Sequence, residues 1–334
     1  MLSVQLNEPK QFSQMQQPMP KRQQGEVLVK VLACGVCGSD LHAMAGKQPF
    51  FNFPRRLGHE LCVEVLSADE QSSFNPDERC VVEPYFFCRQ CTACRAGKTN
   101  CCTRLQVLGI HFDGGHCQFM TLPEQYLHKA AQLSVEQAAL VEPLAIGLHA
   151  VNRGNIQAGE KVIVIGLGTI GLAAALFAKA AGANLLLVDV SEKRVAFAEQ
   201  QMRLGQAIVA KDQLAKQVAE IFPQGADKVI DATGNAQSMN AAFELLGFSA
   251  TLVYVGLHSG DVRLDIGKFI QKDITLAASR AALSSEFKQV IQAITDGQID
   301  PLAMITKKLD FYQIDQSLPK LLEDPELIKA LIEY

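Results

Sequence analysis

The sequence predicts an α/β protein with two domains, one mainly β and one built on a doubly wound parallel sheet. Three observations lead to this prediction. The 334 residues are too many for one hydrophobic core of ordinary size. Short β-type segments, turns and prolines dominate the first 140 or so residues, whereas β-type and helical segments alternate from residue 141 onward. A glycine-rich turn at residues 166–171 joins one of the later strands to a helix.

Periodicity predicts the elements in order. Alternating, β-branched residues predict strands at 25–35, 61–68 and 79–84. A buried strand at 161–166, a helix at 169–182, a strand at 184–190 and a helix at 191–205 follow, with Ser191 as the helix N-cap. Strands at 228–234, 250–256 and 273–280 and an amphipathic helix near 285–294 come later. We expect residues 141–274 to form the parallel-sheet domain, and residues 1–140 with 275–334 to form the mainly β domain.

Composition narrows the class of partner and the compartment. The formal net charge of -4 gives no reason to expect nucleic acid or an anionic membrane as a partner. The first twenty residues are polar where a secretory signal would be apolar, and the longest apolar stretch, residues 172–181, contains Lys179. A buried helix explains this stretch better than a membrane span. We therefore expect a cytoplasmic protein that acts on a small molecule.

Four cysteines lie close together in the segment CRQCTACRAGKTNCC: Cys88, Cys91, Cys94 and Cys102. The spacing C-x2-C-x2-C-x7-C lets four thiolates converge on one ion. Zn²⁺ held by four thiolates has no open position for substrate, so a structural zinc is expected. Disulfide bonds are the alternative, and a chain without a secretion signal disfavours them. The remaining cysteines outside the possible catalytic group are expected to pack as small apolar residues: Cys34, Cys62, Cys80, Cys101 and Cys117.

The segment GLGTIG supplies Gly166, Gly168 and Gly171 in the pattern G-x-G-x-x-G. The pattern alone is a weak signal, but here it follows a strand, opens a helix and precedes an acidic residue at the end of the next strand. The three glycines permit a tight turn, close approach of a pyrophosphate and close packing of helix on strand. Thr169 and Ile170 begin the helix, whose free N–H groups face the phosphates. A glycine-rich turn without a ligand is the alternative.

Asp189 ends the strand NLLLVDV and is placed to accept hydrogen bonds from both ribose hydroxyls of a dinucleotide. Its carboxylate repels a 2′-phosphate, so NAD is expected rather than NADP. Lys193 and Arg194 weaken this preference. Arg194 is a candidate cofactor-binding residue, and the alternative is that both cations belong to a solvated first helical turn.

A second set of possible metal ligands comes from three short motifs. ACGVCGSDLH contributes Cys37, LGHE contributes His59 and Glu60, and LVEPLA contributes Glu142. One thiolate, one imidazole and one or two carboxylates can hold Zn²⁺ with an exchangeable position. Taken singly, each residue is as readily explained by a turn, a helix start or a structural histidine. Their joint occurrence with the four cysteines and the glycine-rich turn favours a catalytic zinc.

The motif that contains Cys37 also holds two candidates for proton transfer. Ser39 could bond an alcohol hydroxyl and His42 could pass the proton to water. A turn hydrogen bond and an ordinary surface histidine are the alternatives. Asp40 is expected to support a ligand rather than to bind the metal.

Over nearly its whole length the chain resembles the zinc-containing medium-chain dehydrogenases. CGSDLH, GHE, the four-cysteine segment, EPLA and GLGTIG occur in the order and at the spacing of that family. The resemblance implies a GroES-like, mainly β catalytic domain, a Rossmann domain, bound NAD, and catalytic and structural Zn²⁺. It implies hydride transfer to NAD and a proton relay from Ser39 through the cofactor ribose to His42.

Within that family the chain is most similar to the polyol and sugar branch, which includes sorbitol and threonine dehydrogenases. That branch uses the Cys, His and Glu that match Cys37, His59 and Glu60 here, so Glu60 is expected to act in catalysis as a ligand. Glu142 would bind zinc directly or through water, in the position where simple alcohol dehydrogenases have a cysteine. The branch also implies that two or four copies of the chain associate through a late strand of the Rossmann sheet.

Several segments resemble bacterial L-galactonate oxidoreductases still more closely, among them GKQPFFNFPRRLGHE and ELIKALIEY. The resemblance implies oxidation of the C5 hydroxyl of L-galactonate to D-tagaturonate. The substrate carboxylate needs a cation, and Arg280 falls where polyol dehydrogenases place a substrate-side arginine, with Arg55 and Arg56 as further candidates. His116 and Arg56 depart from the pattern of the family, and either could alter specificity.

Three other functions stay open at this point. A dehydrogenase for a neutral polyol or for L-threonine would use the same zinc and NAD machinery. A catalytically silent NAD-binding scaffold would lack a ligand or a relay residue, and this chain retains them. A zinc-free reductase is disfavoured by the four-cysteine segment.

Overall fold

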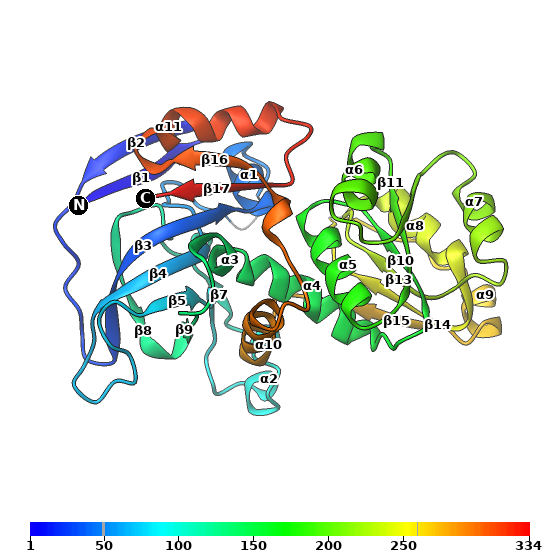
Figure 1. Cartoon of the computed structure of the whole chain (residues 1–334), viewed down its shortest axis with the longest axis horizontal. Helices are drawn as coiled ribbons and strands as arrows, with labels where there is room; N and C mark the ends of the chain where they lie inside the picture. Colours follow the sequence, from blue (N-terminus) through cyan, green and yellow to red (C-terminus); the bar gives the residue numbers. More distant parts are fainter. Residues whose placement is uncertain (49–50, 259) are drawn as a thin grey trace. The chain divides into compact units, whose positions relative to one another are not determined.

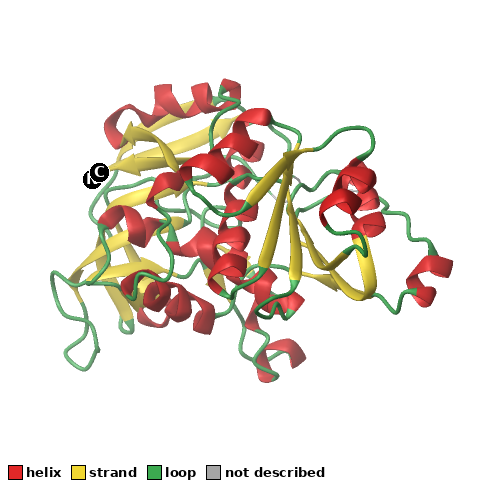
Figure 2. Ribbon diagram, turned by 45° about the vertical axis from the view of Figure 1, so that its right-hand side comes forward, coloured by secondary structure: helices red, strands yellow, loops and turns green. Residues whose placement is uncertain are grey.

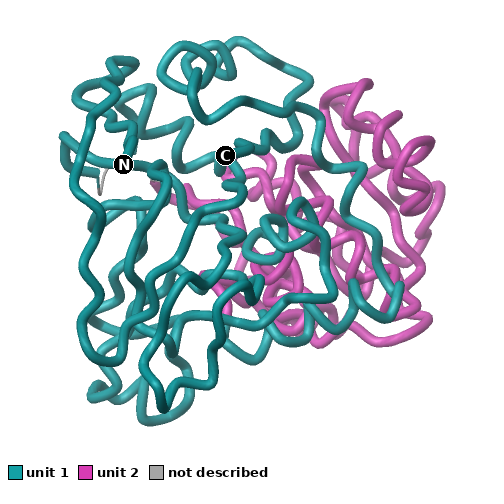
Figure 3. Tube along the Cα trace, turned by 60° about the vertical axis from the view of Figure 1, so that its left-hand side comes forward, with its two compact units in different colours: residues 1–143, 283–334 teal, residues 144–282 magenta. Residues whose placement is uncertain are grey.

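The structure is a computed structural model that describes residues 1–48, 51–258 and 260–334. The chain divides into two compact units (Figure 3). Unit 1 comprises Met1–Pro143 and Leu283–Tyr334, and unit 2 comprises Leu144–Ala282. The second boundary lies at 282/283 rather than at the expected 274/275, because strand β15 (Thr275–Ala278) pairs with β14 (Leu246–Tyr254) in the sheet of unit 2.

Unit 1 contains a curved sheet in the order β16-β17-β3-β4-β5-β9, and β8 pairs with the first half of β3 (Figure 1). The pairs β17–β3, β3–β4, β4–β5, β5–β9 and β3–β8 are antiparallel, whereas β16–β17 is parallel. The strands are β3 (Glu26–Val36), β4 (Glu60–Ser67), β5 (Arg79–Val82), β8 (Phe119–Pro123), β9 (Leu127–Lys129), β16 (Ile305–Asp310) and β17 (Lys329–Glu333).

The strand β3 organises this sheet. Its first residues alternate between buried and half-buried, as the period of two in its sequence predicts, and its last four residues are all buried. Near its end β3 is paired on both sides, with Gly35 opposite Glu60 of β4 and Val36 opposite Ala330 of β17. The C-terminal segment therefore completes the sheet beside the motif that follows β3.

Shorter elements surround the sheet of unit 1. Helix α1 (Gly38–Met44) directly follows β3, and α3 (Val135–Ala139) begins at a capping box formed by Ser134 and Gln137. Helix α4 (Val141–Gly154) begins in unit 1 and continues into unit 2. The others are β1 (Leu2–Glu8), β2 (Gln11–Gln16), β6 (Tyr85–Phe86), α2 (Thr92–Arg95), β7 (Gln106–Val107), α10 (Ser284–Thr295) and α11 (Ile314–Ser317).

Unit 2 is built on a parallel sheet in the order β12-β11-β10-β13-β14-β15. The chain winds outward from β10 in both directions, and helices cover both faces of the sheet (Figure 2). The order therefore reverses between β10 and β13, where open sheets of this type bind ligands at the carboxyl ends of the strands. The remaining elements are β10 (Lys161–Ile165), α5 (Thr169–Ala180), β11 (Asn184–Asp189), α6 (Glu192–Ala196), β12 (Gln206–Val209), α7 (Leu214–Ile221), β13 (Ala226–Asp231), α8 (Ala236–Ala242) and α9 (Ile266–Gln271).

Most sequence-based elements are confirmed, although β14 begins at Leu246 rather than at residue 250. The helix expected over 191–205 is α6 followed by a π-helical turn at Phe197–Gln201, and Ser191 caps it as expected by accepting from the Arg194 N–H. Cys101 is exposed, so its expected packing as a small apolar residue is wrong. It lies in a short turn beside Cys102, whose side chain is the buried one of the two. No helix in the described ranges is long and apolar enough to cross a membrane.

Candidate active site

The glycine-rich turn connects β10 to α5 at the point where the strand order reverses. Gly166 has a φ of +90°, which favours glycine, and its N–H bonds the Val188 carbonyl at 2.8 Å. A Cβ atom on Gly171 would lie 1.7 Å from the Gly166 carbonyl oxygen, so only glycine permits this contact between helix and turn. Thr169 and Ile170 form the first turn of α5, and Gly168 precedes them as the N-cap. The turn has the shape that a pyrophosphate needs.

Asp189 lies at the carboxyl end of β11 with its side chain almost wholly buried. Its Oδ2 accepts from the Leu167 N–H at 2.6 Å, and its Oδ1 accepts from the Ser191 N–H at 2.8 Å. The carboxylate is therefore held beside the glycine-rich turn by the backbone on both sides. The guanidinium of Arg194 also reaches the turn, because a Cβ on Gly168 would lie 3.6 Å from Arg194 Nη1.

A cavity of about 800 Å³ opens at this edge of the unit 2 sheet. Its lining includes Gly166 from the glycine-rich turn, Asp189 from the end of β11 and Thr233 from the turn after β13. Lys211 and Lys216 also line it. The volume falls in the range of small-molecule and cofactor sites, and the lining combines backbone donors with both signs of charge.

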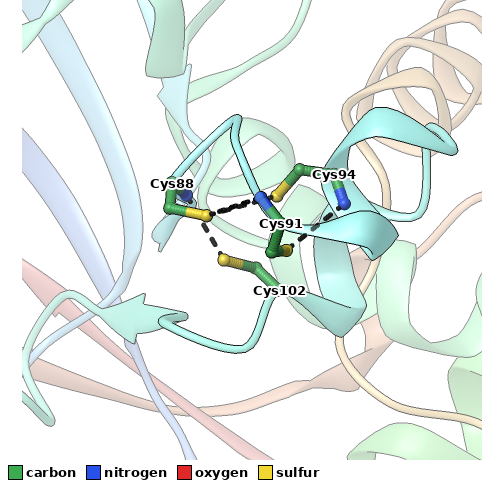
Figure 4. A group of neighbouring side chains, drawn as sticks. All are labelled: Cys88, Cys91, Cys94 and Cys102. Carbon is green, nitrogen blue, oxygen red and sulfur yellow. Dashed lines mark hydrogen bonds between the residues drawn. The ribbon is translucent and has the colours of Figure 1, made fainter.

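The four cysteines of the predicted structural site converge on one point (Figure 4). Their sulfur atoms all lie within 4.8 Å of one another, and the sulfurs of Cys88 and Cys94 are 4.0 Å apart. A tetrahedron of four Zn–S bonds of about 2.3 Å places sulfurs roughly 3.8 Å apart, whereas a disulfide needs about 2.05 Å. All four are free thiols, so the geometry fits a metal and not the disulfide alternative.

Backbone N–H groups support thiolates in this group. The N–H groups of Gln90 and Cys91 lower the pKa of Cys88 to about 5. Desolvation and hydrogen bonds to the neighbouring sulfurs raise the pKa of Cys94 to about 12. A cation among the four sulfurs would compensate the charge of the thiolates, and Zn²⁺ would suit that role.

The second predicted metal group forms where β3 and β4 pair. Because Gly35 lies opposite Glu60, Cys37 follows the end of β3 close to the point where His59 leads into β4 at Glu60. One ligand atom each from Cys37, His59 and Glu60 lies within 4.8 Å of the others. Cys37 is the N-cap of α1, and its sulfur accepts from the Ser39 N–H at 3.5 Å.

The His59 ring lies among negatively charged side chains. Nδ1 of His59 lies 3.7 Å from Oδ1 of the buried Asp40. Burial alone lowers the pKa of His59, but Asp40 and Cys37 outweigh burial and hold this pKa well above its usual value. The surroundings thus attract positive charge. One thiolate, one imidazole and nearby carboxylates are a donor set that suits Zn²⁺.

Glu142 lies in the first turn of α4 with its side chain buried. Among the described residues, Glu142 is not part of the group formed by Cys37, His59 and Glu60, although its charge raises the pKa of His59. The Tyr85 hydroxyl donates a hydrogen bond to Glu142 Oε1. Burial raises the pKa of Glu142 to about 7, and His59 opposes this effect. Tyr85 was missed from the sequence, because nothing there distinguishes it from a core aromatic residue.

Ser39 and His42 both lie on α1, three residues apart and so on one face of the helix. The Ser39 hydroxyl is buried and has no partner among the described side chains, whereas His42 is exposed. The structure thus provides a buried hydroxyl beside Cys37 and an imidazole that reaches water.

Two further buried residues border the group and were not assigned from sequence. Lys329 of β17 bonds both Glu60 carboxylate oxygens, at 2.6 and 2.7 Å. His116 lies against Gly58, on which a Cβ would come within 2.7 Å of the His116 ring. Burial, His59 and Arg56 lower the pKa of His116 to about 3, so it is a neutral ring. A lone lysine in the apolar run IKALI was the one sequence signal available for Lys329.

The candidate carboxylate-binding arginines differ in their surroundings. Arg56 Nη2 lies 3.6 Å from Asp113 Oδ2, and Arg56 Nη1 bonds Gln17 Oε1 at 2.7 Å. Arg55 Nη1 lies 3.9 Å from the same aspartate. Both therefore take part in an ion pair within unit 1. Arg280 is an exposed residue of unit 2, two positions after the end of β15.

Comparison with known proteins identifies the family. Residues 23–132 match the alcohol dehydrogenase GroES-like domain, and residues 169–296 match the zinc-binding dehydrogenase family. The chain is 36% identical to L-galactonate-5-dehydrogenase of Escherichia coli K12 over 330 residues, which cover 98% of this chain and 97% of that protein. It is 31% identical to 2-dehydro-3-deoxy-L-galactonate 5-dehydrogenase of Pseudoalteromonas atlantica over 315 residues, or 93% and 92% of the two chains.

Among solved structures, an alcohol dehydrogenase of Escherichia coli complexed with NADH superposes with a TM-score of 0.93. The two share 27% identity, and the match covers 100% of this chain and 99% of that one. The chain belongs to the zinc-type alcohol dehydrogenase family. The predicted family and the predicted combination of a GroES-like domain with a Rossmann domain are thereby confirmed.

Gly171→Ala is expected to weaken NADH binding at least tenfold, because the new Cβ would lie 1.7 Å from the Gly166 carbonyl and must displace the turn. Titration calorimetry measures the change. Gly267→Ala is the matched control, since its Cβ in α9 would approach only the Asp265 side chain, at 3.3 Å. Equal NADH affinity in both variants would contradict a cofactor site at this turn.

Cys102→Ser is expected to lower the zinc content by one ion per chain, because three thiolates no longer close the tetrahedron. The segment 88–102 should also become susceptible to limited proteolysis. Cys101→Ser is the control, since the adjacent Cys101 is exposed and lies outside the group. Metal analysis by mass spectrometry that finds equal zinc in Cys102→Ser and in wild type would refute the structural site.

Proposed function

We propose that this protein is a zinc-dependent, NAD-linked dehydrogenase that oxidises a secondary alcohol of a sugar acid, with L-galactonate to D-tagaturonate as its reaction. The group of Cys37, His59 and Glu60 is the observation that carries the proposal, because these side chains offer a metal one thiolate, one imidazole and one carboxylate. The 36% identity to the L-galactonate dehydrogenase over 98% of the chain supports the choice of substrate.

In the proposed mechanism Cys37, His59 and Glu60 hold the catalytic zinc, with Glu142 as a further ligand or as the partner of a bound water. Zinc bound there would act as a Lewis acid that lowers the pKa of the substrate hydroxyl. Asp40 orients the His59 ring through Nδ1, and Tyr85 orients the Glu142 carboxylate. Four thiolates at Cys88, Cys91, Cys94 and Cys102 would hold the structural zinc.

The chain's own residues move the proton and hold the cofactor. Ser39 Oγ is placed to hydrogen-bond the substrate hydroxyl and to accept its proton, and His42 is placed to pass a proton on to water; the ribose of a bound cofactor would supply the link between them. Exposure of His42 suits the last step. Bound NAD would supply the hydride acceptor, and the protein's contribution is to place it. Gly166, Gly168 and Gly171, with the N–H groups of Thr169 and Ile170, would bind its pyrophosphate.

We propose NAD rather than NADP because Asp189 is fixed at the end of β11. A carboxylate held there bonds the ribose hydroxyls and repels a 2′-phosphate. Arg194 reaches the same turn and is proposed to contact the pyrophosphate side of the cofactor. This preference predicts that Asp189→Ala lowers the ratio of kcat/KM with NAD to kcat/KM with NADP.

We infer that two or four copies of the chain associate through the edge of the unit 2 sheet. β15 pairs with β14 on one side, and Leu276 on β15 is 46% exposed. Ile266 and Ile270, one turn apart on α9, are also exposed. Open apolar edges of this kind are templates for strand pairing. Leu276→Lys is expected to reduce the mass measured by light scattering to that of a single chain.

The test of the proposed reaction is NADH formation on L-galactonate, on sorbitol and on L-threonine, with NADP as the cofactor control. Turnover confined to sugar acids with NAD is expected. Turnover confined to sorbitol or to L-threonine would contradict the proposed sugar-acid substrate but would leave the proposed zinc- and NAD-dependent mechanism in place.

Arg280 is proposed to bind the substrate carboxylate, since a planar guanidinium pairs with a carboxylate through two hydrogen bonds. Arg280→Ala should raise KM for L-galactonate about 10- to 100-fold, because a hydrogen bond to a charged group contributes about 1.5–3 kcal/mol. Arg263→Ala, another exposed arginine of unit 2, is the control. An unchanged KM in Arg280→Ala would remove that role.

A further inference from the structure

A buried ion pair joins the last strand of the chain to the proposed metal group. Lys329 Nζ lies 2.6 Å from Glu60 Oε1, 2.7 Å from Glu60 Oε2 and 2.9 Å from the Val36 carbonyl oxygen. The side chains of Lys329 and Glu60 are each 1% exposed. The three hydrogens of the ammonium group are thus all used within this small space.

The sheet determines this placement. Ala330 pairs with Val36 across β17 and β3, and Gly35 pairs with Glu60 across β3 and β4. Lys329 therefore meets Glu60 across the end of β3, although the two residues are far apart in sequence. A Cβ on Gly35 would lie 2.0 Å from Glu60 Oε2, so the glycine leaves the space that the carboxylate occupies.

The same carboxylate lies beside the ammonium group of Lys329 and beside the two other possible metal ligands. A Glu60 oxygen lies within 4.8 Å of ligand atoms on Cys37 and His59, and both Glu60 oxygens also accept from Lys329. An ammonium group bonded to both oxygens withdraws charge from them. By Coulomb's law the positive charge of the ammonium group offsets part of the attraction between this carboxylate and a metal ion.

We propose that Lys329 is a positioning residue that competes with the catalytic metal for the carboxylate of Glu60. The competition makes Glu60 a weak, displaceable ligand, so that a substrate oxygen can take its position. This inference rests on the proposed function, because it requires a metal at Cys37 and His59. Lys329 itself touches neither the metal nor the substrate in this account.

Lys329→Met tests the proposal, since methionine keeps the length of the side chain and removes its charge. In this variant the metal is the one remaining partner for the Glu60 charge. The rate of zinc release to a chelator should fall about 10- to 100-fold, the range in which partners of metal ligands change metal affinity. The visible spectrum of the cobalt-substituted protein should change as Glu60 becomes a permanent ligand, and kcat should fall.

Four further variants separate this effect from loss of structure. Lys329→Arg keeps the cation and should release zinc at the wild-type rate. The double variant Glu60→Gln/Lys329→Met removes both charges, so it should not show the slowed zinc release expected of Lys329→Met alone. Glu60→Gln alone should weaken zinc binding less than tenfold, because Glu60 is already a weak ligand. Lys307→Met, on an exposed position of the neighbouring β16, should change nothing.

Thermal unfolding supplies a readout that does not depend on activity. Without metal, Lys329→Met buries a carboxylate without a partner, so the difference in Tm between loaded and metal-free protein should exceed that of wild type. A variant that folds only with zinc would be the extreme form of this result.

The outcomes distinguish this inference from the proposed function. Zinc release and a cobalt spectrum that are unchanged in Lys329→Met would overturn the competition while leaving the dehydrogenase proposal in place. A loss of zinc affinity above a hundredfold in Glu60→Gln would also overturn it, because Glu60 would then be a full ligand; this test stands even where Lys329→Met does not fold. A wild-type protein that binds no metal at Cys37 and His59 would overturn both.

Discussion

The pairing of β3 with β4 on one side and with β17 on the other determines where the charged groups of unit 1 lie. Gly35 stands opposite Glu60, and Val36 stands opposite Ala330. A slip of one residue in either pair would turn the side chains of that strand to the other face of the sheet. The thiol, imidazole, carboxylate and ammonium groups come together because this register is kept by the buried alternating residues of β3.

Burying so many charges in one place is costly, and the structure offsets the cost by pairing. Lys329 neutralises Glu60, Asp40 faces His59, and Tyr85 donates to Glu142. Breaking such a pair by removing one partner typically costs about 3–5 kcal/mol. Excess negative charge remains around His59, as its raised pKa indicates. A divalent cation would be stabilised by that excess, which links the stability of unit 1 to occupancy of its metal group.

The two possible metal groups differ in how far they can be predicted from sequence. The four cysteines lie within a single short segment, so their convergence follows from spacing alone and is found in the structure. Cys37, His59 and Glu142 lie far apart in the chain, and their motifs carried meaning through the resemblance to a family rather than through local physics. The structure brings Cys37 and His59 together with Glu60. Glu142 lies outside this group, and its carboxylate accepts a hydrogen bond from the Tyr85 hydroxyl.

What sequence reasoning missed has a common physical cause. Lys329 and Tyr85 act through partners that only the folded chain brings near, and each is chemically ordinary within its own segment. In contrast, the elements around the glycine-rich turn repeat a local pattern of strand, turn and helix, so β10, α5 and β11 were predicted to within two residues, whereas β14 begins at Leu246 rather than at residue 250. The boundary after β15 was misplaced because a strand's partner cannot be identified from its own residues.

The central claim is that unit 1 holds a zinc ion on mixed ligands near Cys37 and His59. Zinc-edge X-ray absorption on the Cys102→Ser variant tests this most directly, because the structural site is then emptied. The account predicts about one sulfur neighbour at roughly 2.3 Å and nitrogen or oxygen neighbours at roughly 2.0–2.1 Å. A protein without zinc, or zinc surrounded by sulfur alone, would contradict it.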